Sequence, residues 1–543
     1  MRRPADASRS RLLTRHFFGA LFDLGFLTRE GADGFIRVVI GIVAVIITLG
    51  LWLTRMYTIV YAPPGGVADP APYVSAVDAN TMTAIGLPMW IAAFVTVLIS
   101  HSLVPDETDY RVLMALPLTK AFIFRAKLLA LAMFCALFIA GSLLGLTVLV
   151  IVISSSRFAP NIVPVSVAAY WLVGALACLF SVLTIVSING LLTILVPRSR
   201  VHGVTATVKS ALLAALMLSI PSVLALPAKA GAFAGHSRAL YSLPPAWFVG
   251  IERLAFGGGD AFTAVLGRIG LAAFASVAAV AATSYLVLYR RFDRVMLTTV
   301  EVSRRRSRWR GTIGDFTLAT LRRSSLHQGV LVAVSALGVT LAINRVGGQT
   351  ATYAVLGAVW LLMFFIGLAT RAAIALPIDQ RANWVFRMTE SDATRASQLS
   401  AVTRLMRQTT VIVPVLVMAP LEWRLFGARA VPALAMNAVC GLLWVEVLLR
   451  GWRRIPFTSS YIPGKQFIAQ TLVVGIGTLV LGVTIVGAMA LGAARSTAFF
   501  LIASLLLGTI TLVFRRTRLH LWNNGALEFD DKMPSALDLN LYG

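Results

Sequence analysis

The stretch at residues 128–153, LLALAMFCALFIAGSLLGLTVLVIVI, contains no charged residue. An α-helix of about 20 apolar residues crosses the hydrocarbon core of a bilayer, so this stretch predicts a membrane-spanning helix. Similar runs recur along the chain of 543 residues, of which 58% are apolar and 13% are charged. A soluble domain carries about 25% charged residues. The sequence therefore predicts an all-α, polytopic membrane protein, with no separate soluble domain.

The apolar runs predict about twelve membrane spans. The first of them begins after some thirty residues, so the amino terminus does not resemble a cleavable signal peptide. The three cysteines fall within spans and lack the spacing of a metal site or a disulfide, which indicates apolar packing residues. The predicted spans are 35–56, 82–103, 128–153, 166–196, 205–228, 262–289, 326–345, 351–376, 409–424, 430–449, 467–491 and 496–514.

The positive charge is distributed unevenly between the two sides of the predicted membrane. If both termini are cytoplasmic, 38 of the 48 Lys and Arg residues fall on cytoplasmic segments or on the span ends next to them. This asymmetry satisfies the positive-inside rule, and an odd number of spans would destroy it. The net charge of +25 therefore indicates orientation and contact with anionic lipid, and does not indicate a nucleic-acid partner.

The basic segment 290–325 separates six predicted spans from six others. Each half opens with an amphipathic, arginine-bearing stretch, SRLLTRHFFGALFDLGF at 10–26 and IGDFTLATLRRSSLHQG at 313–329, and such stretches are typical of helices that lie in the membrane interface. We therefore expect a duplicated six-span unit, with both copies in the same orientation. The expected divisions are an amino-terminal segment 1–34, a first unit 35–289, the linker 290–325, a second unit 326–514 and a cytoplasmic tail 515–543.

A charged, proline-bracketed segment, 105–120, separates the second and third spans. Pro105 and Pro117 enclose a predicted helix of about ten residues, too short to span, with one apolar face and one charged face. Thr119 then has the position and side chain of an N-cap for the next helix. A short rigid helix of this kind suits insertion into a cleft on a soluble partner, whose movement would pass directly to the two adjoining spans.

A counterpart to this segment, 377–390, lies between the eighth and ninth spans, 272 residues further along the chain. Apolar side chains of both segments are expected to bury against the partner, with the charges around them fixing the register. The predicted contact residues are Asp106, Glu107, Asp109, Arg111, Leu113, Leu116, Pro117, Lys120, Asp379, Arg381, Trp384, Phe386 and Arg387.

The stretch DYRVLMALPLTKAFIFRAKLLA, at 109–130, resembles the cytoplasmic coupling helix of ATP-binding-cassette (ABC) exporter permeases of the second export class. The family pattern has an acidic residue, a Leu-Leu-x-x-Leu-Pro-like turn, a polar residue and a basic residue before the next span. In the second half, RANWVFRMTE (381–390) and RIPFTSSYIPGK (454–465) resemble segments of large fused bacterial permeases, although Met388 and Thr389 replace the Leu-Pro turn. The matching residues are Leu113, Leu116, Pro117, Thr119 and Lys127.

The resemblance implies a transport subunit in a bacterial inner membrane, with both termini cytoplasmic, driven by separate ATPase subunits. The chain has no G-x-x-x-x-G-K-[ST] phosphate loop, so it is expected not to hydrolyse ATP and to need no cofactor or metal. The scarcity of polar residues within spans favours a hydrophobic or amphipathic cargo. The fused halves could form a pathway alone or pair with another copy as a homodimer.

Three other functions stay open. An ion-coupled secondary transporter needs ionisable groups inside the membrane, and only Glu446 is placed well inside a span, where pairing with Arg450 at i+4 is the plain explanation. A polytopic enzyme acting on lipid-linked substrates could hold magnesium on the DETD stretch at 106–109, although an acidic helix start is the commoner meaning. A structural or scaffold protein is the third.

Overall fold

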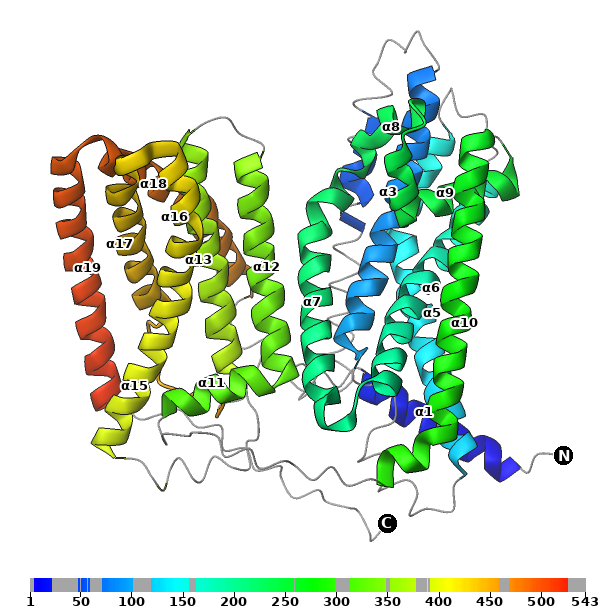
Figure 1. The fold of residues 1–543 in the computed structure, drawn as a ribbon, viewed down its shortest axis with the longest axis horizontal. Helices are drawn as coiled ribbons and strands as arrows, with labels where there is room; N and C mark the ends of the chain where they lie inside the picture. The colour runs from blue at the N-terminus through cyan, green and yellow to red at the C-terminus, as the bar shows by residue number, and fades with distance from the viewer. Residues whose placement is uncertain are drawn as a thin grey trace. The chain divides into compact units, whose positions relative to one another are not determined.

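A computed structural model describes the chain as helices, turns and connecting segments, with no strand among the described residues. The chain forms two compact units, Met1–Ser303 and Arg304–Gly543 (Figure 1). The division falls within the basic segment 290–325. The described residues are 4–21, 47–48, 50–55, 57–58, 71–100, 119–155, 163–257, 259–297, 313–347, 352–376, 388, 391–458 and 468–525.

The first unit is built around helix α3. This helix contacts α5, α6, α7 and α9, so it occupies the centre of the unit. The described elements of the unit are α1 (Pro4–Leu21), α3 (Ala71–Leu98), α5 (Lys120–Ser154), α6 (Val163–Leu195), α7 (Arg198–Leu224), η2 (Leu226–Lys229), α8 (Ala230–Ala234), η3 (Arg238–Ser242), α9 (Pro244–Phe256) and α10 (Ala261–Leu297).

The second unit is built around helix α13, which contacts α12, α16, α17 and α18. The short helix α11 lies at one end of this unit, beneath α12 and α13 in Figure 1. The described elements are α11 (Ile313–Arg323), α12 (Ser325–Gly347), α13 (Thr352–Ala375), α15 (Asp392–Arg407), the π-helical turn η5 (Gln408–Ile412), α16 (Val413–Phe426), η6 (Gly427–Arg429), α17 (Ala430–Leu448), α18 (Ile468–Arg495) and α19 (Thr497–Asn524).

Local sequence signals set several helix ends. Ser391 and Thr394 form a capping box at the start of α15, and the Ser496 hydroxyl accepts a hydrogen bond from the Phe499 N–H at the start of α19. Gly427 follows the last residue of α16 with a positive φ of 56°, a conformation that glycine adopts without steric cost. These signals explain why an almost uniformly apolar chain divides into separate helices at these points.

Close backbone approach and buried polar contacts hold the first unit together. A Cβ on Gly250 of α9 would lie 2.3 Å from the Gly267 backbone nitrogen of α10, so these two helices can pack this closely only through glycine. The Tyr170 hydroxyl of α6 donates to the Leu143 carbonyl of α5 over 3.0 Å. Lys209 of α7 donates to the last carbonyl of α3, at Leu98, over 3.0 Å, where a cation suits the negative helix end.

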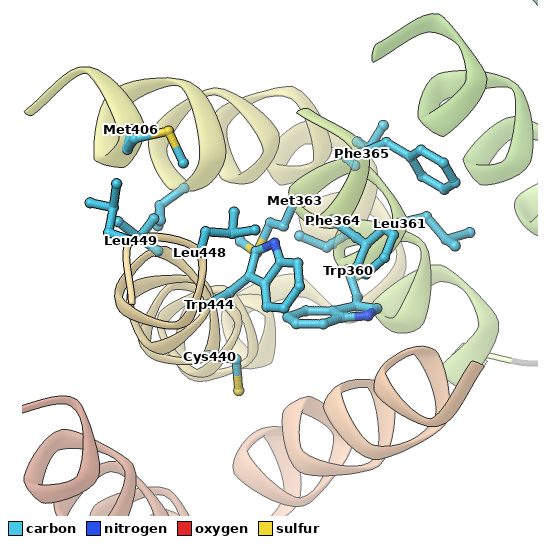
Figure 2. Packing of buried hydrophobic residues seen from close by; sticks show 14 of the residues in the cluster. Trp360, Leu361, Met363, Phe364, Phe365, Met406, Cys440, Trp444, Leu448 and Leu449 are labelled. Atoms are coloured by element: carbon cyan, nitrogen blue, oxygen red, sulfur yellow. The ribbon is translucent and has the colours of Figure 1, made fainter. Parts of the chain in front are cut away.

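An aromatic layer forms the centre of the second unit (Figure 2). The rings of Phe364 on α13 and Trp444 on α17 stack with centroids 5.1 Å apart, and Trp360 lies 5.4 Å from Trp444. A Cβ on Gly482 of α18 would lie 2.2 Å from the Trp360 indole nitrogen, so a glycine there admits the ring. Stacked aromatic pairs add about 0.5–1.5 kcal/mol to the burial of their area. This layer fixes α13 against α17 and α18.

Every predicted span after the first overlaps a described helix, and short helices, α1 and α11, lie within or across the two predicted amphipathic stretches. The first predicted span, 35–56, lies mostly outside the described residues. Within the described part of the chain, ten helical stretches are long and apolar enough to cross a membrane, and one of them, Thr394–Leu448, contains α16 and α17 together. The protein is therefore an all-α, multi-pass membrane protein, while the count of twelve and the duplication stay predictions.

Candidate functional site

The two predicted docking segments lie almost entirely outside the described residues. Residues 101–118 and 377–387 hold every predicted contact residue except Lys120. Lys120 is the first residue of α5, and Thr119 caps that helix, as predicted, by accepting a hydrogen bond from the Phe122 N–H. Met388, at the end of the second segment, is 78% exposed.

Helix α5, which leaves the first segment, is held by α1. Phe17 of α1 is buried in one cluster with Ile123 and Ala126 of α5. The Lys127 ammonium lies 5.2 Å from the centroid of the Phe17 ring, within cation–π range. Phe17, on the apolar face of α1, is therefore turned toward α5. The reason is that α5 offers a complementary apolar face and a cation at the same place.

In the second unit, a helix next to the predicted docking segment also packs on the unit's first described helix. The helix that follows the second segment is α15, and it contacts α11, the short helix that opens the unit. Leu321 of α11 belongs to the same buried cluster as Leu399 and Val402 of α15. In each unit, the helix next to a predicted docking segment is thus packed on the helix that opens that unit.

A buried ion triad ties α15, α17 and α19 together. The Glu446 side chain is fully buried, and its carboxylate accepts hydrogen bonds from Arg518 Nε over 2.8 Å and from Arg407 over 3.2 Å. The predicted pairing of Glu446 with Arg450 is wrong. Because α17 ends at Leu448, Arg450 does not continue its helical register, and its guanidinium lies over the Phe514 ring, 5.7 Å from the centroid.

A second buried acid, Glu422 on α16, forms no ion pair with any residue that the structure describes. Its Oε1 accepts a hydrogen bond from the Asn437 side-chain amide of α17 over 3.4 Å. The Glu422 Oε2 and the Asn437 Oδ1 are both buried without a hydrogen-bond partner. The sequence pattern singled out Glu446 and did not identify Glu422 as a second buried acid. An acid and an amide at facing positions of an apolar hairpin are the signal that could have identified this pair.

The first unit has its own buried charges, on α3 and α9, and α9 lies away from α1 toward the other end of the unit (Figure 1). Arg253 of α9 donates through Nε to the Asp78 carboxylate of α3 over 3.0 Å. Glu252, the neighbour of Arg253, has an Oε2 that is shielded from solvent and lacks a hydrogen-bond partner. Burial raises the pKa of Glu252 to about 7, since the opposing effect of Arg253 is smaller and Asp78 adds repulsion.

The described residues can be compared with the requirements of a metal site, and the whole chain with known proteins. Across the parts of the chain that the structure describes, no group of three or more His, Cys, Asp or Glu residues could hold a metal ion. The DETD stretch at 106–109 lies outside those parts. Comparison of the chain with protein-family models, with curated proteins and with solved structures returns no match. The function must therefore be argued from the arrangement of the helices and their buried charges.

Proposed function

We propose that this chain is the membrane-spanning permease subunit of an ABC exporter, and that it moves a hydrophobic or amphipathic cargo. Separate ATPase subunits supply the energy and dock on segments 105–120 and 377–390. The chain works in a bacterial inner membrane with both termini cytoplasmic, and carries out no chemical reaction itself.

One observation carries the proposal. Each predicted docking segment runs into a helix that is packed on the helix opening its own unit, as α5 packs on α1 and α15 on α11. A displacement of either segment would therefore move two packed helices together. The buried triad of Glu446, Arg407 and Arg518 extends this connection in the second unit, from α15 to α17 and α19. Movement applied at 377–390 thus has a physical route into the unit.

The proposal is tested with an ABC-type ATPase subunit from the same genome as this chain. The two proteins are co-expressed, and co-purification is measured for Leu116→Asp and Trp384→Asp. A charge placed on an apolar docking side chain should abolish co-purification while the chain still inserts into the membrane. Leu254→Asp serves as a matched control, since Leu254 is an exposed leucine of α9, distant in sequence from both segments. Unchanged co-purification of both docking variants would overturn the docking role.

An ion-coupled secondary transporter is the second candidate, and Glu422 favours it. A carboxyl group buried within a candidate span, with an unpartnered oxygen, is the kind of group that binds and releases ions. In that case purified chain alone, in proteoliposomes, would move cargo down an imposed ion gradient, and Glu422→Gln would stop it. For an ABC permease, the same preparation would be inactive until the ATPase and ATP are added.

A further inference from the structure

A cavity of about 680 Å³ lies in the second unit between α15 and α19. The two helices are joined at one end of it, where Arg395 donates to backbone carbonyls at the end of α19 and the Trp522 indole donates to the Arg395 carbonyl over 3.1 Å. The π-helical turn η5 forms part of the wall through Gln408 and Ile412. Such turns occur frequently at functional sites.

The cavity is strongly cationic. Four arginines line it, namely Arg404, Arg407, Arg515 and Arg518, and none of the residues lining it is acidic. The fully buried carboxylate of Glu446 pairs with two of these arginines, Arg407 and Arg518, and Asp315 lines an adjoining pocket that shares Arg404. The lining therefore has a net charge of about +3 when Glu446 is counted.

Part of this charge has no partner. Within the described residues, neither Arg404 nor Arg515 forms an ion pair, and both side chains are exposed. The Nε of Arg407 is buried without a hydrogen-bond partner. Guanidinium groups bind phosphate oxygens through paired, charge-assisted hydrogen bonds. These donors have the chemistry of a site for a phosphate-bearing anion.

Apolar side chains continue from the cavity along both helices. Ile412 and Leu519 line it. Beyond them, Leu416 on α16 is 65% exposed, and Leu512 and Leu505 on α19 are 55% and 75% exposed. The arginines of α19 directly follow its apolar run, at the position where a spanning helix meets lipid headgroups. A free phosphate would leave these apolar side chains exposed, whereas the acyl chains of a lipid would cover them.

We propose that this cavity binds the phosphodiester headgroup of an anionic phospholipid, with the acyl chains lying along the exposed faces of α16 and α19. The guanidinium groups of Arg404 and Arg515 hold the phosphate, and Arg407 supplies its free Nε donor. The buried Glu446 carboxylate holds the Arg407 and Arg518 side chains in position through its ion pairs with them. This site does not depend on the transport function proposed above.

Native mass spectrometry of the full-length chain in neutral detergent tests the site. The protein is titrated with phosphatidylglycerol, with phosphatidylcholine and with inorganic phosphate. The double variant Arg404→Gln/Arg515→Gln removes the two exposed arginines of the cavity. The control Arg424→Gln/Arg516→Gln removes one exposed arginine from α16 and one from α19, and neither lines the cavity. Thermal unfolding in the same detergent establishes that both variants fold.

The wild type should retain phosphatidylglycerol about tenfold more strongly than phosphatidylcholine, and the cavity variant should lose that preference while the control keeps it. Equal losses in the two double variants would mean general surface attraction and would overturn the proposal. Binding of inorganic phosphate that competes with phosphatidylglycerol at equal concentration would overturn the lipid assignment, because it would show that the acyl chains contribute nothing.

Discussion

Glu446 and Glu422 lie on successive helices of the same unit, and both are buried, with 1% and 0% of their surfaces exposed. Their surroundings are opposite. Glu446 accepts hydrogen bonds from two arginines, with its closest approach 2.8 Å to Arg518. Glu422 has a neutral amide, Asn437, at 3.4 Å. A buried carboxylate is costly without a cation, so the same side chain serves as an ion-pair partner in one place and as an uncompensated polar group in the other.

The largest expected effect comes from removing the main partner of Glu446. Arg518→Ala leaves the buried carboxylate with only Arg407, and breaking a buried pair in this way costs about 3–5 kcal/mol. We expect a clear loss of thermal stability in detergent. Arg516→Ala is the matched control, because Arg516 is an exposed neighbour on the same helix and should leave stability unchanged. Similar unfolding temperatures for the two variants would mean that the triad contributes nothing to the fold.

Replacing each acid by its amide compares the two sites directly. Glu446→Gln leaves the buried guanidinium of Arg518 without its counter-charge, and losing charged hydrogen bonds of this kind costs about 2 kcal/mol. Glu422→Gln should cost less than about 0.5 kcal/mol, since the new amide keeps the shape and offers a donor to the unpartnered Asn437 Oδ1. Chemical or thermal unfolding in detergent measures both. Equal costs would show that Glu422 is held as a charged group.

The sequence predicted the helices well, because a lipid-facing helix must be a long apolar run and such runs are visible without any partner. The spans after the first, the cap at Thr119 and the short helices α1 and α11 followed from local pattern alone. The partners of the buried charges could not be predicted from local pattern. Glu446 was matched to Arg450 by spacing, but its partners Arg407 and Arg518 lie 39 and 72 residues away in the chain.

The arginine-lined cavity was missed for the same reason. Its residues come from two segments, 396–412 and 515–523, which are more than a hundred residues apart and read singly as ordinary cytoplasmic positive charge. The two segments form one cavity because the hydrogen bond between Trp522 and the Arg395 carbonyl brings them together. The docking segments 105–120 and 377–390, by contrast, were identified from their own sequence and stay predictions.

A smaller effect is expected for the second partner of Glu446. The Arg407 side chain is 35% exposed, so water can replace part of what it supplies to the carboxylate. We expect Arg407→Ala to cost about 1 kcal/mol, well below the cost of Arg518→Ala. The double variant Arg407→Ala/Arg518→Ala measures their coupling through the shared carboxylate. Strictly additive costs would contradict a single triad and indicate two independent contacts.

Glu252 in the first unit is intermediate between the paired Glu446 and the unpaired Glu422. It has a cation next to it, Arg253, but that cation already pairs with Asp78. Burial raises the pKa of Glu252 from 4.5 to about 7. The folded state therefore holds its proton more tightly than the unfolded state, and stability should fall as the pH rises through the interval between these two values. The half-buried side chain can relax toward water, so we expect a loss on the order of 1 kcal/mol or less.

Unfolding temperatures between pH 4.5 and 7.5 measure this slope of stability against pH, and Glu252→Gln should flatten it. An unchanged slope in that variant would assign the pH dependence to other groups and place Glu252 with the compensated acids, beside Glu446.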